Sequence, residues 1–483
     1  MINRPQRWIS LALFSLFLSI ATGPYASAAT SPTRSATTLA SPSATYDGGS
    51  SRTGYSSDTS ITPANVARLT QRWHITESAP ISGQPIVDSG VVYWGDWNGL
   101  MHATSLTGKP LWSTSLGRSA RPPGCPYPLS SLGILSSATI GTINGRRVVW
   151  VGGGKGQLVA LNASNGKTIW TTNLKTEPGD AIWSSPAYYG GSIYVGVASW
   201  QGCPDEFGRI VQLNAATGKV QNAINFSSML PKKCAGPGAW SSPAVDPSDG
   251  SIFIGISNDL CGSKYQDAIA KLDPSTLAIE SLWQVPSSQH AADSDFGATP
   301  MLFSADIDGV QRQLVGAENK NGVYYALDRT NLAAGPVWQY RVESSAAYAN
   351  ASCNNTISTS AWAGAGLPIM VAGVTLSGSK CIGTMTALDP STGQPVWQVT
   401  LQGGVEGAVT ELPGLVVVGA GRDLDALSSS NGATLFSYAE PVPQKGEKGS
   451  YGAPEYWFWD PPTVSGGVIL AANQDGTLRA FGI

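Results

Sequence analysis

Short runs of alternating apolar and polar residues recur along the chain, and most are followed by a turn and a tryptophan. In the clearest copy, residues 383–397, Met385 and Ala387 have the two-residue spacing of one buried strand face. The following Asp389-Pro-Ser-Thr-Gly393 has turn chemistry, because Pro fixes φ, Asp bonds its own backbone and Gly accepts a positive φ. This stretch predicts two short strands joined by a hairpin, with the final tryptophan ring packing between neighbouring units.

The same unit recurs often enough to predict a repeat architecture. Further copies occupy residues 98–112, 156–170 and 208–220, looser copies occupy residues 267–283, 322–338 and 423–436, and an eighth begins at Gly476 and stops at Ile483. A spacing of about 40–60 residues is typical of four-stranded propeller blades. Glycine and proline are abundant, at 56 and 32 residues, and no stretch has a sustained helical period. We therefore predict an all-β fold, an eight-bladed β-propeller over residues 46–483.

β-rich stretches such as residues 192–197 and 251–256 precede the repeat units. Many follow Ser-Pro-Ala, as at Ser185-Pro-Ala187 and Ser242-Pro-Ala244. We expect these stretches to be the innermost strands, which line the central axis. Their flanking loops should form the face on which a site lies.

The eighth copy lacks the tryptophan strand that ends most of the other copies. Residues 69–75, which contain Trp73, have the pattern of a strand and no turn before them. We predict that this N-terminal strand supplies the missing outer strand of the last blade and closes the ring. Ring closure would remove two exposed sheet edges.

The N-terminus has the pattern of a secretory signal peptide, predicted over residues 1–28. A basic start precedes the apolar run 9–20, and Ala26-Ser-Ala28 fits a cleavage site. The run is too short to span a bilayer comfortably, so we expect no transmembrane anchor. Residues 29–45, rich in Ser, Thr, Ala and Pro, predict a flexible linker. The expected location is extracellular, or periplasmic where the source has an outer membrane.

Six cysteines in a chain expected to be secreted predict disulfide bonds. We predict the pair Cys353–Cys381, since both residues lie in loops of one repeat. Three pairings stay open for the other four, which are Cys125, Cys203, Cys234 and Cys261. No Cys-x-x-Cys spacing occurs, which argues against zinc, thioredoxin-like and haem-attachment motifs.

Charge and histidine content argue against several classes of function. The formal net charge is −3 without a basic stripe, so nucleic acid is not an expected partner. The three histidines, His74, His102 and His290, are scattered, which argues against a hydrolase triad or a zinc site. A glycosidase would need paired carboxylates, for which loose acidic residues such as Glu406 and Glu411 are the sole support.

Five longer segments carry more specific motifs. They are residues 47–73, 92–99 (Val-Tyr-Trp-Gly-Asp-Trp-Asn-Gly), 239–247 (Ala-Trp-Ser-Ser-Pro-Ala-Val-Asp-Pro), 295–297 (Asp-Phe-Gly) and 314–328. With these motifs the chain resembles the quinoprotein dehydrogenases, whose eight-bladed propellers bind pyrroloquinoline quinone (PQQ), and it looks closest to polyvinyl-alcohol dehydrogenase-like members. The resemblance covers nearly all of the mature chain.

The resemblance implies a site that binds both PQQ and Ca²⁺. Glu206 and Asn258 match family residues that hold a Ca²⁺ which also binds the quinone, and Asp295 completes the implied metal ligands. Ca²⁺ takes six to eight oxygen ligands and polarises the carbonyl that accepts hydride. Trp240 matches the tryptophan on which the flat quinone stacks. Simpler alternatives are a solvated loop carboxylate for Glu206, a turn residue for Asn258 and a blade-packing ring for Trp240.

The resemblance also implies which residues carry the chemistry. Asp295 matches the catalytic base, which takes the alcohol proton as hydride leaves the carbon, and Asp293 is its rival. Lys320 matches a cation near the quinone oxygen, where it would stabilise charge on the reduced cofactor. The alternative for Lys320 is an ordinary surface lysine in a hairpin turn.

Two departures from the family limit this interpretation. Residues 129–137 lack the adjacent cysteine pair of the alcohol and methanol dehydrogenases, and the chain has no Cys-x-x-Cys-His haem motif. Electrons would therefore pass to a separate acceptor. The resemblance implies oxidation of a small-molecule or polymeric alcohol. The alternative is a non-catalytic propeller that binds protein or polymer, as outer-membrane assembly scaffolds do.

Overall fold

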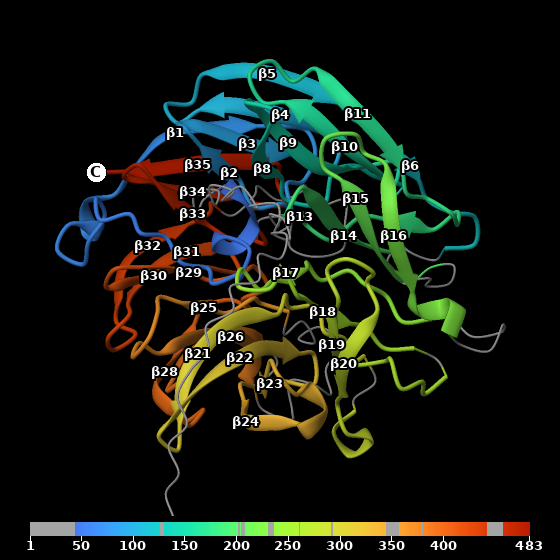
Figure 1. Ribbon diagram of the computed structural model, residues 1–483. Coiled ribbons are helices and arrows are strands. Elements are labelled where there is room, and N and C mark those ends of the chain that lie inside the picture. Colours follow the sequence, from blue (N-terminus) through green and yellow to red (C-terminus); the bar gives the residue numbers. More distant parts are fainter. Residues whose placement is uncertain are drawn as a thin grey trace, which may run out of the picture. The chain divides into compact units, whose positions relative to one another are not determined.

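Each sequence repeat folds into strands of an antiparallel sheet, and eight such sheets form a ring in the computed structural model of the chain (Figure 1). The structure describes residues 44–125, 130–200, 203, 208–229, 236–259, 261–290, 293–343, 357–377, 380–441 and 457–483. The predicted signal peptide and most of the predicted linker lie outside these residues and stay predictions. The last two linker residues, Ala44 and Thr45, are buried.

The eight sheets are the predicted propeller blades, each with four main strands. Blades 1 to 4 consist of β2 (Ile86–Asp88), β3 (Val91–Gly95), β4 (Leu100–Ser105) and β5 (Pro110–Ser115); β8 (Thr139–Ile143), β9 (Arg146–Gly153), β10 (Gln157–Asn162) and β11 (Thr168–Asn173); β13 (Ala187–Tyr189), β14 (Ser192–Ser199), β15 (Arg209–Asn214) and β16 (Val220–Asn225); and β17 (Ala244–Val245), β18 (Ile252–Ile256), β19 (Ala268–Leu272) and β20 (Ile279–Gln284). Blades 5 to 8 consist of β21 (Met301–Ile307), β22 (Val310–Asn319), β23 (Val323–Asp328) and β24 (Pro336–Arg341); β25 (Ala361–Trp362), β26 (Ile369–Ser377), β27 (Lys380–Leu388) and β28 (Pro395–Leu401); β29 (Thr410–Leu412), β30 (Leu415–Ala420), β31 (Asp423–Ser428) and β32 (Thr434–Ala439); and β33 (Thr463–Ser465), β34 (Val468–Ala472), β35 (Thr477–Gly482) and β1 (Thr70–Thr76).

Three short strands and five 3₁₀ turns complete the described structure. The strand β12 (Asp180–Ala181) pairs with the end of β14, and β6 (Ser119–Ala120) pairs with β7 (Ser131–Leu132). The 3₁₀ turns are η2 (Tyr46–Gly48), η3 (Val66–Arg68), η4 (Phe226–Met229), η5 (Ser287–Gln289) and η6 (Leu332–Ala334). The described residues contain no α-helix, which agrees with the predicted all-β class.

The innermost strands are not the ones predicted. The first strands of neighbouring blades contact one another, as β13 does with β8 and β17, so these short strands surround the axis. The predicted stretches 192–197 and 251–256 form β14 and β18, which are the second strands of their blades. An innermost strand such as β17 has two residues, too few to show any alternation.

A tryptophan on an outer strand docks onto the turn of the next blade. The Trp338 indole N–H donates to the carbonyl of Pro390 at 2.9 Å, and its ring lies against Gly393, at φ +67°. A Cβ on that glycine would lie 2.4 Å from the ring, so the position requires glycine. The same indole-to-turn bond recurs in Trp112 to Ala163, Trp170 to Ala215, and Trp397 to Ser429.

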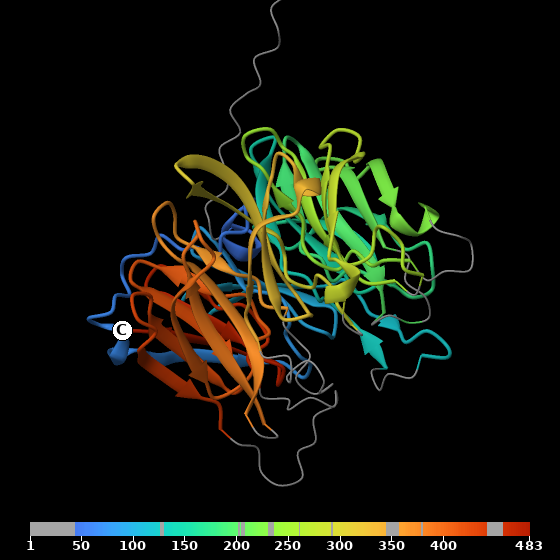
Figure 2. The same ribbon diagram turned by 90° about the horizontal axis from the view of Figure 1, so that it is seen from below.

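The ring is closed by the N-terminal strand, as predicted. β1 pairs antiparallel with β35, from Thr70 opposite Gly482 to Thr76 opposite Thr477. Figures 1 and 2 both show this blue strand beside the red strands of blade 8. The Trp73 indole donates to the Leu106 carbonyl in blade 1 at 3.0 Å, so the closing joint uses the same contact as other blade junctions.

The segment before β1 crosses the axis and bonds successive blades. The carbonyls of Ser50, Ser51, Thr53 and Gly54 accept backbone N–H groups at or beside the innermost strands of blades 4, 5, 6 and 7. Arg52 is fully buried and donates to the carbonyls of Pro186, Pro243 and Tyr46. This dark-blue segment lies near the centre of the ring in Figure 1. It ties these blades together at the axis.

One disulfide joins Cys125 to Cys203, which selects one of the three pairings left open by the sequence. Cys261 and Cys381 are also disulfide-bonded. Cys353, the predicted partner of Cys381, lies outside the described residues, so that pairing stays a prediction.

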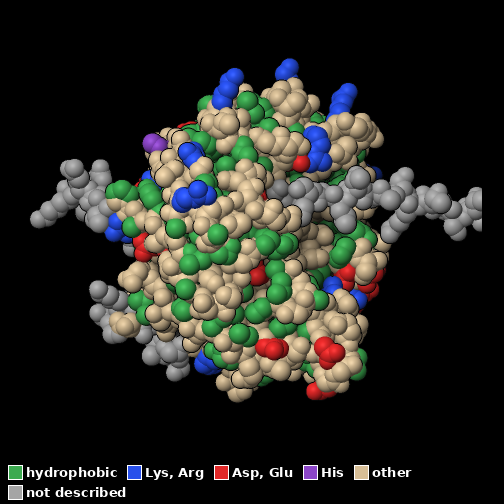
Figure 3. Space-filling model, turned by 90° about the vertical axis from the view of Figure 1, so that its left-hand side faces the viewer, with side chains coloured by type: hydrophobic (Ala, Val, Ile, Leu, Met, Phe, Trp, Pro, Cys, Tyr) green, Lys and Arg blue, Asp and Glu red, His purple; other side chains and the backbone are tan. Residues whose placement is uncertain are grey.

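The surface and the secondary structure bear on the expected partners. On the side shown in Figure 3, Lys and Arg side chains gather near the upper edge, and most Asp and Glu side chains lie lower. Among the described residues, no helix has the length and apolar character needed to span a bilayer.

Candidate functional site

A cavity lies where the eight innermost strands begin. Besides Tyr46, its lining comes from the loops that lead into the first strand of every blade. It contains about 720 Å³ of empty space, part of it open to solvent. The aromatic side chains that line it are Trp183, Trp240, Trp459 and Tyr46.

A belt of hydroxyl groups surrounds this cavity, formed by Ser185, Ser242, Thr299 and Thr359. Each hydroxyl accepts a backbone N–H from the preceding blade: Ser137 donates to Ser185, Ser185 to Ser242, Ser242 to Thr299 and Thr299 to Thr359, at 2.9–3.0 Å. The belt therefore fixes the spacing of blades 2 to 6 around the axis. Three of its members line the cavity directly, so a ligand there meets polar oxygens.

Trp240 lies in the loop before β17, and its position depends on a glycine of the next blade. A Cβ built on Gly297 would lie 2.1 Å from Cη2 of the Trp240 ring. The motif Asp295-Phe296-Gly297 therefore serves packing as well as chemistry, because Phe296 is fully buried and Gly297 leaves room for the indole. The half-buried ring lines the cavity and is available for stacking.

Asp295 lies in the loop before β21, two residues before Gly297, and both of its carboxylate oxygens have partners. Oδ1 accepts the backbone N–H of Asn258 at 2.8 Å, and Oδ2 pairs with Nζ of Lys320 at 3.0 Å. The residue is 8 % exposed. The structure thus brings together three of the predicted site residues, and Nζ of Lys320 lies 5.3 Å from the centre of the Trp240 ring, which adds the fourth.

Lys320 is not an ordinary surface lysine, although it does lie in the hairpin turn between β22 and β23. Its side chain is 12 % exposed, and Nζ also contacts Oδ2 of Asp293 at 3.0 Å. Burial favours the neutral amine, but the Asp295 and Asp293 carboxylates outweigh it and raise the pKa of Lys320 above its ordinary value. The ammonium is therefore retained at neutral pH, next to the ring.

Asp293 differs from Asp295 in its surroundings. Its side chain is 46 % exposed, against 11 % for Asp295. A proton-accepting carboxylate works best in a water-poor position fixed by donors, and Asp295 has that position. The two aspartates therefore differ in burial and in the donors that hold them.

A second buried acid, Asp267, interacts with Asp295 and was not predicted. Its side chain is 3 % exposed, and Oδ2 lies 3.6 Å from Nδ1 of His290. Burial, followed by repulsion from Asp295, raises the pKa of Asp267 to about 8. Asp267 therefore holds a proton more readily than an ordinary aspartate does.

Of the predicted metal ligands Glu206 and Asn258, the structure describes only Asn258. Glu206 lies outside the described residues, so its role stays a prediction. Asn258 follows β18 and is half-buried beside Asp295, which its backbone N–H contacts. A Ca²⁺ ion takes oxygen ligands, and the Asp295 carboxylate and the Asn258 side chain offer that chemistry at adjacent positions.

The cavity residues that sequence analysis missed come from loops far apart in the chain. Trp183, Trp459 and Glu406 belong to blades 3, 8 and 7. One local signal was present: in Ser-Ser-Pro the first serine bonds a glycine of its own blade, as Ser241 does with Gly255, while the second serine joins the belt.

The residues present fit a planar aromatic ligand with polar substituents. A half-buried indole offers a stacking face and the belt offers hydroxyls, while the Lys320 ammonium, paired with Asp295 and Asp293, lies 5.3 Å from the ring centre. PQQ is such a ligand, since it is a flat fused-ring quinone with carboxylates. The predicted cofactor is therefore chemically compatible with this cavity.

Comparisons with known proteins agree with this architecture. Residues 44–333 match the family model described as "Glucose/ethanol/alcohol dehydrogenase, beta-propeller domain", and residues 320–481 match "Outer membrane protein assembly factor BamB". A polyvinylalcohol dehydrogenase from a Pseudomonas species is 24 % identical over 334 residues, covering 61 % of this chain and 50 % of that protein. A quinohemoprotein alcohol dehydrogenase from Comamonas testosteroni is 24 % identical over 324 residues, covering 58 % and 44 %.

Solved structures show the same fold. The crystal structure of quinohemoprotein alcohol dehydrogenase from Comamonas testosteroni superposes with a TM-score of 0.67 at 17 % identity, covering 93 % of this chain and 81 % of that chain. A europium-containing methanol dehydrogenase gives a TM-score of 0.68 at 14 % identity, covering 91 % and 98 %.

The extent of these matches decides what they establish. The chain spans about half the length of the curated relatives it matches, so the match does not by itself assign their activities to this chain. The first family model, however, covers more than half of the 483 residues. The chain belongs to the β-propeller family of the glucose, ethanol and alcohol dehydrogenases.

Proposed function

We propose that the chain is a PQQ-dependent oxidoreductase that oxidises an alcohol at the axial cavity. The observation that carries this proposal is the joint position of Trp240, Lys320 and Asp295. The ammonium lies 5.3 Å from the ring centre and 3.0 Å from the carboxylate. A scaffold has no need to place a stacking surface, a buried cation and a base together beside a cavity.

The residues of the chain would divide the work as follows. When bound, PQQ supplies a quinone that accepts hydride. Asp295 would take the hydroxyl proton of the alcohol at Oδ2, while its Oδ1 stays bonded to the Asn258 N–H. Lys320 would stabilise developing negative charge, because its ammonium is buried and fixed by two carboxylates.

We further propose a Ca²⁺ ion at the same site, held by Asn258, Asp295 and Glu206. Support comes from the position of Asn258 beside Asp295 and from the oxygen chemistry of all three side chains. A cation there would compete with Lys320 for Oδ2 of Asp295. Ca²⁺ binding should therefore loosen the Lys320–Asp295 contact.

Substrate, location and electron acceptor follow from the family resemblance. We propose a secondary or polymeric alcohol as substrate, because relatives include polyvinylalcohol dehydrogenases. We propose secretion from the signal-peptide pattern of residues 1–28. Electrons would leave to a separate acceptor, since the sequence has no haem-attachment motif.

The first test is a calorimetric titration of the purified chain with PQQ, with and without Ca²⁺. The proposal expects one-to-one binding that is tightened by Ca²⁺, weakened in Trp240→Ala and unchanged in the control Trp112→Phe at a blade junction. Alcohol-dependent dye reduction by the loaded protein would then establish the activity. No binding at high micromolar PQQ with Ca²⁺ present would contradict the proposal.

A second candidate function has one observation in its favour. Residues 320–481 match the model of an outer-membrane assembly factor, so the second half of blade 5 and blades 6 to 8 have the pattern of a scaffold propeller. In that case the chain would bind protein or polymer through its loops without a cofactor. Failure of PQQ binding together with stable capture of a defined polymer, such as polyvinyl alcohol, would favour this candidate.

A further inference from the structure

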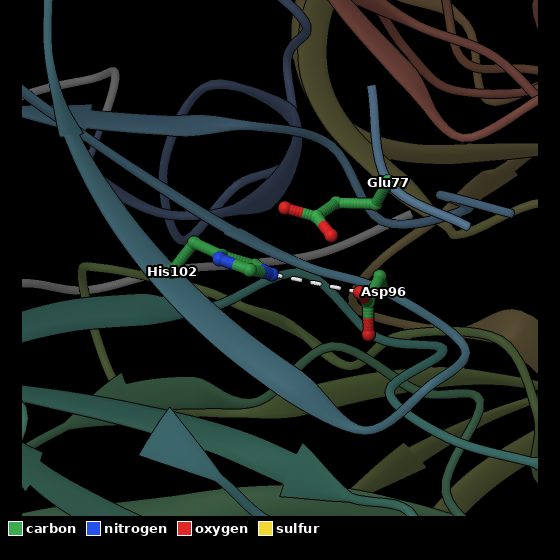
Figure 4. Close-up of side chains that lie close together, drawn as sticks. All are labelled: Glu77, Asp96 and His102. Atoms are coloured by element: carbon green, nitrogen blue, oxygen red, sulfur yellow. Dashed lines mark ion pairs between the residues drawn. The ribbon is translucent and has the colours of Figure 1, made fainter. Parts of the chain in front are cut away.

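Glu77, Asp96 and His102 bring three side chains of metal-ligand type together where blade 8 meets blade 1 (Figure 4). Their ligand atoms all lie within 4.8 Å of one another. Glu77 follows the ring-closing strand β1, Asp96 follows β3, and His102 lies on β4. We propose that this cluster binds a divalent transition-metal ion of the Zn²⁺ type. The ion would link the ring-closing strand β1 to blade 1.

Two of the three side chains are buried with an unsatisfied atom directed into the cluster. Asp96 is fully buried and His102 is 8 % exposed. Oδ1 of Asp96 accepts the Leu100 N–H in a tight turn, but Oδ2 has no hydrogen-bond partner among the described residues, and neither does Nε2 of His102. Figure 4 shows these two atoms facing each other. Leaving such groups buried and unpaired is costly, and a shared cation would satisfy both.

The separation of these atoms suits metal ligands better than a hydrogen bond. Nε2 of His102 lies 3.5 Å from Oδ2 of Asp96. Hydrogen bonds between nitrogen and oxygen are usually shorter, at about 2.7–3.2 Å. Metal bonds of about 2.0–2.1 Å to a tetrahedral ion place neighbouring ligands about 3.3 Å apart, close to the observed distance. Two carboxylates and one neutral imidazole would balance the double positive charge.

The His102 ring is already fixed in position. It stacks on the Trp94 indole, with ring centroids 4.1 Å apart and an interplanar angle of 15°. The indole is itself bonded to Oγ1 of Thr104 at 3.1 Å. Glu77 is half-buried, so it provides the third ligand and a route from solvent. Little side-chain freedom is therefore lost when an ion binds.

Other blades show that the repeat does not itself require this pair. At the position of Asp96, blades 5 and 8 carry Asn319 and Asn473, and at the position of His102 blade 5 carries Tyr325. An amide is thus enough for the turn. The acid and imidazole combination is a property of blade 1, beside the joint where the ring closes.

This site is independent of the proposed oxidoreductase activity, because Trp240, Asp295 and Lys320 belong to blades 4 and 5. The test therefore needs neither PQQ nor substrate. The purified chain is stripped with a chelator and titrated with Zn²⁺ by calorimetry, and its melting is followed with and without the ion. We expect one Zn²⁺ per chain. At about a hundredfold excess over the dissociation constant, the expected rise in Tm is about 3 °C.

Variants locate the binding to this cluster. His102→Gln and Asp96→Asn should weaken Zn²⁺ binding by at least about a hundredfold, and Glu77→Gln by at least about tenfold. The matched control is His74→Gln, which removes an exposed imidazole from β1 and should bind Zn²⁺ as the parent does. Since Glu77 is half-buried after a strand end, its variant keeps the test usable should a core variant fail to fold.

The proposal would be overturned by the absence of stoichiometric Zn²⁺ binding, by parental affinity in Glu77→Gln and Asp96→Asn, or by tighter binding of Ca²⁺ than of Zn²⁺ at these residues. Parental Tm shifts with Zn²⁺ in all three variants would likewise place the ion elsewhere.

Discussion

Lys320 and Asp295 are joined twice, once through the backbone and once through their side chains. The Lys320 backbone N–H donates to the Asp295 carbonyl at 3.0 Å, and Nζ lies 3.0 Å from Oδ2 of the same residue. The backbone bond holds the turn after β22 against the loop before β21. The charged pair therefore has one fixed geometry, which the chemistry of a base and a cation requires.

Replacing Asp295 and Asp293 by asparagine, one at a time, separates their roles. Asp295→Asn should lower alcohol-dependent dye reduction by at least about a hundredfold, because the amide cannot take the proton. Asp293→Asn should keep most of the rate, because Asp293 is the more exposed and Lys320 retains Asp295 as partner. Rates are compared at saturating PQQ and Ca²⁺. Full activity in Asp295→Asn would remove it as the base.

A glycine substitution tests the stacking surface without removing a polar group. In Gly297→Ala the new Cβ would meet the Trp240 ring at 2.1 Å, so the indole must move. Overpacking of this kind costs about 1–3 kcal/mol, and we expect PQQ to bind at least about tenfold more weakly. The control Gly153→Ala, whose Cβ would have its nearest contact at 3.4 Å, should bind PQQ normally. Unchanged affinity in Gly297→Ala would mean that the ligand does not stack there.

Local pattern was enough to predict the blades and the joint between the first and last of them. Alternation and turn residues are repeated in every copy, and Trp73 stands out as a tryptophan strand without a hairpin. The path of residues 50–54 across the axis could not be predicted, because it depends on carbonyls that meet N–H groups from four different blades. The assignment of innermost strands failed since strands such as Ala244–Val245 are too short to show a period.

Candidate site residues could be predicted where they lie in a recognisable motif. They could not be predicted where folding brings together residues that are distant in sequence. Asp295 and Lys320 were identified by resemblance, and the structure places them in contact. His102 was dismissed because the histidines are scattered along the chain. Its acidic neighbours Glu77 and Asp96 come close to it through folding of blade 1 and closure of the ring, which sequence spacing does not show.

Glu411 gives the fold a dependence on pH. It is 3 % exposed, in β29, and burial raises its pKa to about 8, although a backbone hydrogen bond from Ala363 opposes the shift. Between its ordinary value of 4.5 and about 8, the folded chain keeps a proton that the unfolded chain releases. Stability should therefore fall as pH rises through this window, by up to about 5 kcal/mol.

Glu411→Gln tests this dependence, because the amide does not titrate. The variant should lose part of the decline in unfolding free energy between about pH 5 and about pH 9, and it should exceed the parent in stability at the upper end. Urea unfolding at both pH values measures the difference. The control Glu280→Gln, with a side chain 40 % exposed, should follow the parent. Parallel curves for Glu411→Gln and the parent would show that this carboxyl is not responsible.

The closing joint can be tested at two scales. Removal of residues 474–483 deletes β35, which pairs with both β1 and β34, so the whole ring should lose stability and a normal melting curve would contradict closure.

Trp73→Ala tests the same joint with a single substitution, since it removes the indole bond to Leu106 and the packing on Gly108. We expect it to lower the unfolding free energy by about 3 kcal/mol, the lower end for a large aromatic ring, because Trp73 is half-buried. His74→Ala, an exposed neighbour on the same strand, should change stability little. Equal stability of the Trp73 and His74 variants would mean that the joint is held by backbone pairing alone.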